Sequence, residues 1–492
     1  MADWSLWRML IFTLIVTYCS NYQLYNEYAV NNLARTLQEW IGRQLGSQAT
    51  AHSVWSLFVS SLLFGKMFGP FVSAPMAERF GRKKAMLVCC CVFIISGVLT
   101  GFAEPSGSFL MLWIGRLLSG FAVGMAIVLP SLWVTEASPR KWRGFYGSFQ
   151  IWGNSFSAII ANAVTLPGAL NTASTWPIAM VLGIVPISLL LPIILLWIPE
   201  SPRFLFYKRS EPVKLHRSIA FFQGLNNVDD VLADMREEQR DNSRTDTVSL
   251  WAFVKDKRNR KRILLVVTIM GFTHIDLSRI LDVYSTIIAV QAGWSFGAAA
   301  VATLIPSVAK AILCPLVLSF SDRTGRRLPM LISSYMMAVC LLLMALVFAF
   351  WPSGFGAGLV IVVCQGTIRI LHGIFQGNGV VVMAEILQQN SRAKVVAACR
   401  VMCWFVAFLL TLTLLPAAKL LGWGWPFAFC FLCTLIRSVV CQRNLHETRR
   451  QQLGHIAISR EPSVAGANED APLIGQSPNQ DDNLSMDLNS EG

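Results

Sequence analysis

The feature that most constrains this chain is a series of apolar blocks, each long enough to cross a lipid bilayer. A bilayer core of about 30 Å requires about 20 helical residues. Apolar residues make up 54% of the 492 residues and charged ones 14%. We therefore predict an all-α membrane protein with twelve transmembrane helices, near residues 9–29, 54–77, 85–104, 109–133, 145–167, 176–197, 263–286, 295–319, 328–351, 356–386, 395–416 and 423–441.

The formal net charge of +13 reflects membrane topology. Its Lys and Arg residues lie in the short segments between apolar blocks, without the interleaved aromatics of a nucleic-acid surface. One set of loops carries most of them: Arg79, Arg82, Lys83, Lys84, Arg140, Lys141, Arg143, Arg323, Arg326, Arg327, Arg392 and Lys394. The opposite set carries Arg35, Arg43 and Lys419. The positive-inside rule predicts that the basic loops and, with an even number of spans, both termini are cytoplasmic.

Three loop motifs occur twice, in the same order, at an offset of roughly 245–250 residues. The segment 78–84 after the second block recurs as 322–327 after the eighth, and the segment 199–203 recurs as 446–450. Glu136 and Glu385 are each followed seven residues later by an arginine. This repetition predicts two pseudo-symmetric six-helix bundles, at residues 1–207 and 263–450, joined by a polar cytoplasmic linker at 208–262.

Several of these segments resemble a known family. Gly115-Arg116, the segment 136–144 and the segment 199–205 are similar to the sugar-porter branch of the major facilitator superfamily, over roughly residues 9–450. The resemblance implies alternating access and a cytoplasmic gate, to which we assign Glu78, Arg82, Arg116, Glu136, Arg143, Asp322, Arg326, Glu385 and Arg392. The alternative is that these charges only set topology, but topology requires no acids.

The central cavity departs from the family pattern. Sugar porters typically begin helix 7 with Gln-Gln-Leu-Ser-Gly-Ile-Asn, of which the segment 275–281 keeps only Leu277, Ser278 and Ile280. The positions where the family carries its helix 8 Asn, helix 10 Trp and helix 11 Asn hold Lys310, Val380 and Cys403, whereas the helix 5 glutamine is kept as Gln150. Replacing amides with charged groups changes which solute the cavity prefers.

Ionisable residues within transmembrane segments are expected to be functional. Our candidate substrate site is Asn26, Gln150, Asn154, Asp276, Arg279, Asp282, Lys310, Arg369 and His372. Two interpretations stay open. Either Asp276, Arg279 and Asp282 pair with one another along one helix face, or Lys310 and Arg369 hold an anionic group of the solute. His372 has a similar alternative as a packing residue.

The predicted function is transport of a small polar solute, most simply uniport of a sugar or a related organic solute, anionic ones included. A proton-coupled organic-ion transporter is one alternative, with Glu27 as the nearest acid in helix 1, and a non-transporting solute sensor is another. We expect a monomer in the lipid bilayer. We do not expect an enzyme, because no phosphate-binding loop or nucleophile motif is found. We expect no cofactor and no metal site.

Two groups of small residues are predicted to have structural roles. Gly81 and Gly325 fit tight turns after the second and eighth blocks. Small residues four positions apart, which let helices approach closely, are Gly120 with Gly124 and Gly373 with Gly377. Cys430 and Cys433 have CxxC spacing, but their apolar setting indicates packing rather than redox or zinc chemistry.

The polar segment 451–492 is predicted to be a disordered cytoplasmic tail. Within it, Glu469, Leu473 and Ile474 resemble an acidic dileucine signal, which sorting adaptors read. An inert tail is the alternative. The destination is therefore either the plasma membrane or an endosomal or lysosomal membrane.

Overall fold

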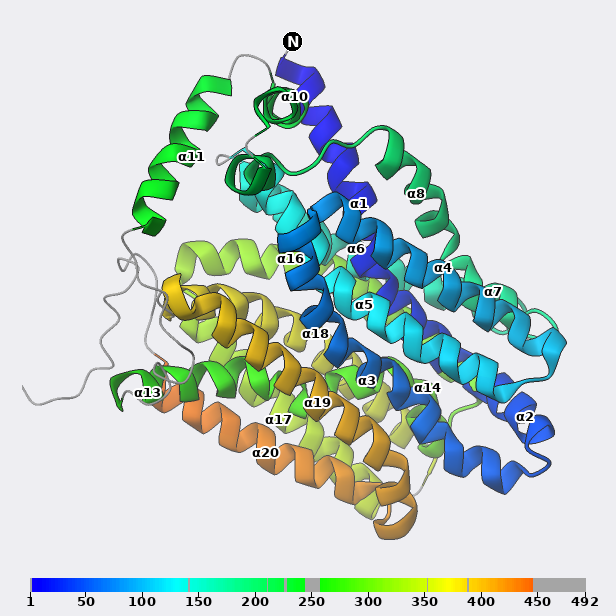
Figure 1. Cartoon of the computed structure of the whole chain (residues 1–492). Helices are drawn as coiled ribbons and strands as arrows, with labels where there is room; N and C mark the ends of the chain where they lie inside the picture. Colours follow the sequence, from blue (N-terminus) through cyan, green and yellow to red (C-terminus); the bar gives the residue numbers. More distant parts are fainter. Residues whose placement is uncertain are drawn as a thin grey trace, which may run out of the picture. The chain divides into compact units, whose positions relative to one another are not determined.

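The computed structural model describes residues 2–139, 142–209, 211–224, 228–243, 257–351, 353–386 and 389–445. Within these ranges the chain forms helices and connections and contains no strand (Figure 1). The described residues all belong to one compact unit. The predicted tail and its sorting signal lie outside the described residues.

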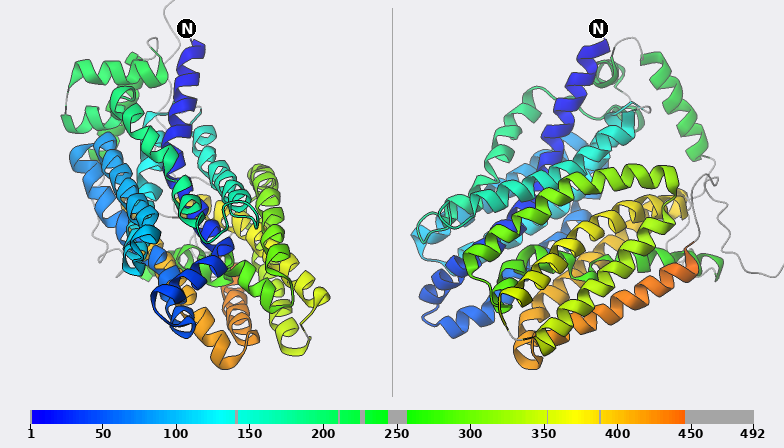
Figure 2. Two further views of the ribbon diagram at one scale, coloured as in Figure 1. Left: turned by 90° about the vertical axis from the view of Figure 1, so that its right-hand side faces the viewer. Right: turned by 180° about the vertical axis from the view of Figure 1, so that it is seen from behind.

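The N-terminal part consists of long helices followed by short ones. Its helices are α1 (Ala2–Asn32), α2 (Ala34–Gln44), α3 (Gln48–Phe80), α4 (Arg82–Ser106), α5 (Phe109–Ala137), α6 (Arg143–Val164), α7 (Trp176–Leu182), α8 (Val185–Leu196), α9 (Pro202–Phe204), the π-helix η2 (Leu205–Arg209), α10 (Pro212–Gln223) and α11 (Val228–Ser243). Within it, α3 and α4 pack on α5, and α1 packs on α6 and α10 (Figures 1 and 2).

The C-terminal part repeats the pattern of long helices. Its elements are α13 (Lys257–Val266), the π-helix η4 (Val267–Gly271), the 3-10 helix η5 (Thr273–Asp276), α14 (Ser278–Gln291), α15 (Phe296–Ala302), α16 (Leu304–Thr324), α17 (Arg327–Phe350), α18 (Phe355–Ile386), α19 (Gln389–Leu421) and α20 (Gly424–Asn444). Here α17 packs on α18 and α20, and α16 on α18. The two parts meet where α3 contacts α19, α6 contacts α16 and α1 contacts α14. The division into two separate bundles stays a prediction.

Ten segments of the described chain are long and apolar enough to cross a membrane. The two predicted spans that are not among them correspond to α1 and α6, which have 31 and 22 residues. Both helices carry buried polar side chains, such as Asn26 and Asn31 in α1 and Asn162 in α6. Polar groups that face other helices are compatible with a transmembrane position, although they lower the mean hydropathy.

Two of the predicted turns depend on glycine. Gly81, between α3 and α4, has φ +100°, and Gly325, between α16 and α17, has φ +115°. A side chain at such a φ would clash with the backbone, so glycine is the residue that allows the turn. The predicted roles of Gly81 and Gly325 are therefore confirmed.

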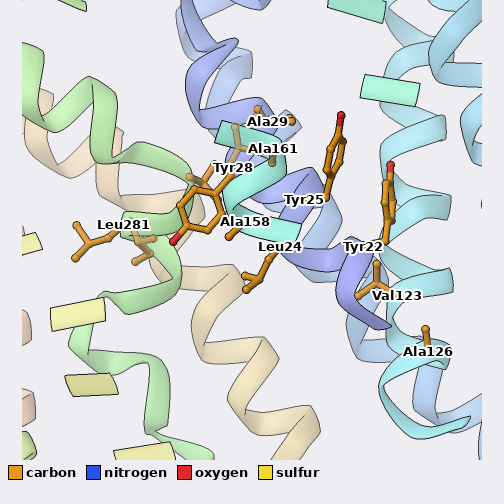
Figure 3. Packing of buried hydrophobic residues seen from close by; sticks show 14 of the residues in the cluster. Tyr22, Leu24, Tyr25, Tyr28, Ala29, Val123, Ala126, Ala158, Ala161 and Leu281 are labelled. Atoms are coloured by element: carbon orange, nitrogen blue, oxygen red, sulfur yellow. The ribbon is translucent and has the colours of Figure 1, made fainter. Parts of the chain in front are cut away.

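Helix α1 buries aromatic side chains on two of its faces (Figure 3). Tyr22 and Tyr25 point to one side and stack with ring centroids 5.9 Å apart. Tyr28 points to the other side, toward Leu281 of α14, and its hydroxyl donates a hydrogen bond to Asp282, 2.8 Å away. Helix α1 therefore contacts both the helices of its own part and α14.

Helices α3 and α5 approach closely along their glycines. A Cβ atom on Gly124 of α5 would lie 2.6 Å from the carbonyl oxygen of Lys66 and 2.9 Å from Cα of Gly69, both in α3. A Cβ atom on Gly120 would likewise meet the backbone of Leu62. The predicted packing role of Gly120 and Gly124 is confirmed, and the same contact positions the backbone of Lys66.

We predict that Gly124→Ala destabilises the protein by about 1–3 kcal/mol, the usual cost of overpacking. The new methyl group would force α3 and α5 apart, because the atoms it meets are backbone. Gly147→Ala in α6 is the matched control, since no atom lies within 4 Å of its Cβ position. Thermal unfolding in detergent should show a lower Tm for Gly124→Ala and an unchanged or higher one for Gly147→Ala; equal Tm values would contradict the packing argument.

Candidate functional site

The predicted seventh transmembrane helix is interrupted in its middle. After α13 the chain passes through η4 and η5, and α14 starts at Ser278. Leu277 at the break has φ +62° and is the one non-glycine residue with positive φ in the described chain. This conformation costs an L-residue about 1–2 kcal/mol. The carboxylate of Asp276 accepts a hydrogen bond from the backbone N–H of Ser278 at 3.0 Å, which helps the new helix begin.

Asp276 is buried and is held by side chains of two other helices. Its Oδ2 lies 3.3 Å from Nη1 of Arg437 in α20 and 3.0 Å from Nδ1 of His372 in α18. Nδ1 of His372 also lies 2.9 Å from the hydroxyl of Ser278. Arg437 further donates to the carbonyl oxygens of Phe272 and Thr273 at the break, at 3.4 and 3.1 Å. The Phe272 carbonyl also accepts from the backbone N–H of Ile275. Arg437 thus provides a counter-charge for Asp276 and hydrogen bonds to the backbone at the helix break.

Asp282, one and a half turns further on, has a separate set of partners. Nη1 of Arg279 lies 3.1 Å from its Oδ2, and Nε of Arg369 lies 3.5 Å from its Oδ1. The hydroxyl of Tyr28 donates to the same Oδ1. Arg369 also donates to the carbonyl oxygen of Leu281. The interpretation that Asp276, Arg279 and Asp282 pair along one face is therefore correct for Arg279 with Asp282, whereas Asp276 pairs elsewhere.

Lys310 in α16 differs from the other predicted cations. Its side chain lies beside α18, where Cε is 3.3 Å from the Cβ position of Gly373. In the described part of the chain, its ammonium group forms no ion pair within 4.0 Å, although Asp282 acts on its charge through space. Lys310 therefore retains hydrogen-bonding capacity for a ligand.

Three predicted polar residues lie in the N-terminal part. Asn26 accepts a hydrogen bond from Nη1 of Arg116 at 2.7 Å and donates to the hydroxyl of Tyr22 at 3.0 Å. Gln150 and Asn154 are half-buried on α6. The amide oxygen of Gln150 accepts from Ser131 of α5 at 2.6 Å. Asn26 thus belongs to a buried hydrogen-bond network, whereas Gln150 is linked to the neighbouring helix.

The assignment of Arg116 to the cytoplasmic gate is wrong. Its guanidinium donates to Asn26 and to the carbonyl oxygen of Phe58, 3.1 Å away. Arg116 lies two turns from the start of α5, whereas Glu136 lies at its end. At a rise of 1.5 Å per residue, these positions are about 30 Å apart along the helix. The prediction placed Arg116 with the gate because it belongs to the segments that resemble the family. It did not take into account that the helix separates Arg116 from Glu136.

Two of the other predicted gate residues of the first repeat, Arg82 and Glu136, do come together. Nη2 of Arg82 lies 2.6 Å from Oε1 of Glu136, and the Ser201 hydroxyl donates to the other carboxylate oxygen. Glu200 accepts from the backbone N–H of Arg82 at 2.9 Å. Burial raises the pKa of Glu200 above its ordinary value, while the N–H groups and the Arg82 charge act in the opposite direction. Glu200 and Ser201 were not predicted as gate residues, although their motif was noticed.

The remaining gate residues are less fully described. Glu78 lines a surface pocket with Arg79, Phe204 and Lys208. Arg326 is half-buried and has an interaction partner. The side chains of four predicted residues lie outside the described part: Arg143, Asp322, Glu385 and Arg392. The second repeat of the gate therefore stays a prediction.

Sequence reasoning missed two buried cations. Lys66 of α3 forms an ion pair with Glu27 of α1, and both side chains are fully buried. The second is Arg437, the partner of Asp276. Each is a charged residue inside an apolar block of the sequence. That position alone would have marked both as candidate functional residues. We call Glu27, Lys66, Asp276, Arg279, Asp282, Lys310, Arg369, His372 and Arg437 the buried charge cluster.

Comparisons with known proteins agree with this architecture. The family described as "Sugar (and other) transporter" matches residues 12–458. The mouse (Mus musculus) solute carrier family 2 facilitated glucose transporter member 4 is 26% identical, over 89% of this chain and 88% of its own. Member 1 from Gallus gallus is 27% identical, over 91% and 92%. The E. coli xylose transporter XylE, in a partially occluded inward open conformation, superposes with a TM-score of 0.73 at 17% identity, covering 89% of this chain and all of that one. The all-α major facilitator fold is thereby confirmed.

We predict that Asp276→Asn destabilises the protein by about 3–5 kcal/mol, because it leaves the buried guanidinium of Arg437 without a counter-charge. Thermal unfolding in detergent measures the effect. Glu39→Gln is the control, since the Arg35–Glu39 pair is exposed and such pairs contribute about 0–1 kcal/mol. A Tm for Asp276→Asn equal to that of the control would show that Asp276 does not hold Arg437 in place.

Proposed function

This chain belongs to the sugar transporter family, and from that premise we propose that it carries a small organic solute across the membrane by alternating access and by uniport. The chain is thus a multi-pass membrane transporter of the sugar-porter kind rather than an enzyme. Substrate sites of such folds lie near the bilayer midplane, between the repeats. The buried charge cluster, around the break in the seventh span, is our proposed site.

The cargo that we propose is an anionic organic solute. The observation that carries this is Lys310, a cation without an ion pair among the described residues, beside Arg369 and His372 of α18. The carboxylates of the cluster are Glu27, Asp276 and Asp282, and each already has at least one cationic partner. Excess positive charge at membrane depth is costly. A carboxylate or similar group of the solute would compensate it.

A neutral sugar is the second candidate. It is favoured by the relatives, which are named as facilitated glucose transporters. A sugar hydroxyl needs neutral donors and acceptors, such as the amides of Gln150, Asn154 and the buried Gln365 of α18. Against it stand the charged residues of helices 7, 8 and 10, two of which, Asp276 and Lys310, occupy positions where the family carries amides.

Uniport is supported by the partners of the acids. Asn26, which accepts the hydrogen bond from Arg116, is a neutral amide and carries no titrating proton. Glu27 next to it is held by Lys66 and lies 3.7 Å from Arg279. Both carboxylate oxygens of Glu27 thus face cations of the protein, so this acid is already engaged by internal partners. Proton coupling and a sensor without transport are the alternatives that an uptake measurement separates.

The proposed gate is the cluster of Arg82, Glu136, Glu200 and Ser201. Buried ion pairs that have two discrete arrangements suit a conformational switch. We further propose that this side is cytoplasmic, as the basic loops indicate, and that the protein works as a monomer in the plasma membrane or an endosomal or lysosomal membrane.

We predict saturable uptake of organic anions by purified protein in proteoliposomes, without a requirement for a pH gradient. The panel comprises monocarboxylates, urate, hexoses, polyols and organic cations. Lys310→Asn should raise KM for the anions about tenfold or more, which corresponds to about 1.4 kcal/mol, because it removes the cation that has no internal partner. Lys310→Arg should retain most of the affinity.

The matched control is Lys419→Asn, the same chemical change at an exposed position near the end of α19. If the protein takes up hexoses and Lys310→Asn does not change that uptake, the anion proposal is contradicted and the neutral sugar is favoured. Binding without saturable uptake of any member would favour the sensor.

A further inference from the structure

The ion pair of Glu27 and Lys66 belongs to the buried charge cluster, but its two charges compensate each other and need no group of the solute. Both side chains have no exposed surface, and the two residues lie on neighbouring helices of the N-terminal part. Two charges at this depth are expensive to desolvate, and well-packed apolar residues of the same volume would be as stable or more so. Stability alone therefore does not account for the pair, and the side chains that surround it indicate a role between the two parts of the chain.

The pair faces the C-terminal part of the chain on two sides. Oε2 of Glu27 lies 3.7 Å from Nη1 of Arg279 in α14. The ammonium group of Lys66 lies 4.6 Å from the centre of the Trp404 ring in α19. The first is an ionic contact and the second a cation–π contact, which strengthens when water is excluded. Each charge of the pair thus has one partner in its own part and one in the other part.

Further contacts continue this seam between α1 and α14. The Tyr28 hydroxyl donates to Asp282, and the Arg369 guanidinium lies 5.2 Å from the Tyr28 ring centre. One turn further, the amide of Asn31 donates to the Thr286 hydroxyl at 2.9 Å and accepts from the Thr286 backbone N–H at 3.1 Å. These residues occupy the last turns of α1, at the end opposite to the basic loops.

A purely internal role would leave these contacts unexplained. If the pair only stabilised the packing of α1 on α3, it would not need contacts with side chains of α14 or α19. Arg279 is instead divided between Asp282 of its own helix and Glu27 of the other part. Separation of the two parts along this seam would leave Arg279 with one carboxylate and remove Lys66 from the aromatic face.

We propose that Glu27 and Lys66 are positioning residues of the transport cycle and form a charged latch with Arg279 and Trp404. The latch joins the last turns of α1 to the first turn of α14 and to the middle of α3 and α19. It opens when the side opposite to the basic loops opens. The proposal rests on alternating access as proposed above. It does not depend on which solute is carried.

The test measures access to the seam rather than transport. Thr286→Cys is introduced as a reporter, because Thr286 is buried in the seam, and its reaction with a membrane-impermeant maleimide is followed in oriented proteoliposomes. The protein without this reporter gives the background of the native cysteines. Every variant carries the same reporter, so its own effect on the seam cancels.

The decisive variant exchanges the charges, Glu27→Lys with Lys66→Glu. It keeps the ion pair inside the N-terminal part, but it turns an ammonium toward Arg279 and a carboxylate toward the Trp404 ring. The labelling rate should rise about tenfold, which corresponds to a shift of about 1.4 kcal/mol. The control exchanges an exposed pair on α2, Arg35→Glu with Glu39→Arg, and should leave the rate unchanged.

A second variant covers the case in which the exchange does not fold. Glu27→Gln with Lys66→Met removes both charges and should be tolerated, and it should still raise the labelling rate several-fold. If either variant elutes as a monodisperse protein and labels at the parental rate, the pair serves only its own part and the latch is disproved. The labelling reaction does not require the transported solute, so its result can be interpreted even if the proposed class of solute is wrong.

Discussion

The cost of burying ionised side chains in a membrane is the constraint on which much of this structure depends. Carboxylates and guanidinium groups at this depth are retained only if each finds a counter-charge or hydrogen bonds. Asp276 has Arg437 and His372, Asp282 has Arg279 and Arg369, and Glu27 has Lys66. Their partners come from different helices. The charges therefore determine which helices must stay in contact, and Lys310 is the member for which we propose the solute as counter-charge.

The same constraint explains how the seventh span can be broken. A helix break in lipid frees carbonyl groups that water cannot reach, and other parts of the protein must satisfy them. Here the backbone N–H of Ile275 donates to Phe272, and Arg437 adds hydrogen bonds to Phe272 and Thr273 while it pairs with Asp276. Leu277 adopts its unfavourable left-handed conformation at this point. Such strain persists where surrounding contacts enforce it and is common at functional sites.

Close helix packing and charge placement are linked in the N-terminal part. The backbone of Lys66 lies against Gly124, so the approach of α3 and α5 fixes where the Lys66 side chain starts. From there it reaches both Glu27 and Trp404. Glycines that look like packing residues alone thus also position a charge at the contact between α3 and α19.

Apolar block length, turn glycines and repeated loop motifs can be read directly from the amino-acid sequence, and they were enough to predict the fold class, ten of the twelve spans, the turns at Gly81 and Gly325 and the family. They also identified Arg82 with Glu136, since their motifs lie at helix ends. Which charges pair, as Asp276 with Arg437 and Glu27 with Lys66, followed only from the packing of the helices. That packing also removed Arg116 from the gate. Asp276 and Arg437 are 161 residues apart and Glu27 and Lys66 are 39 apart, and the choice among several nearby counter-charges depends on packing in three dimensions.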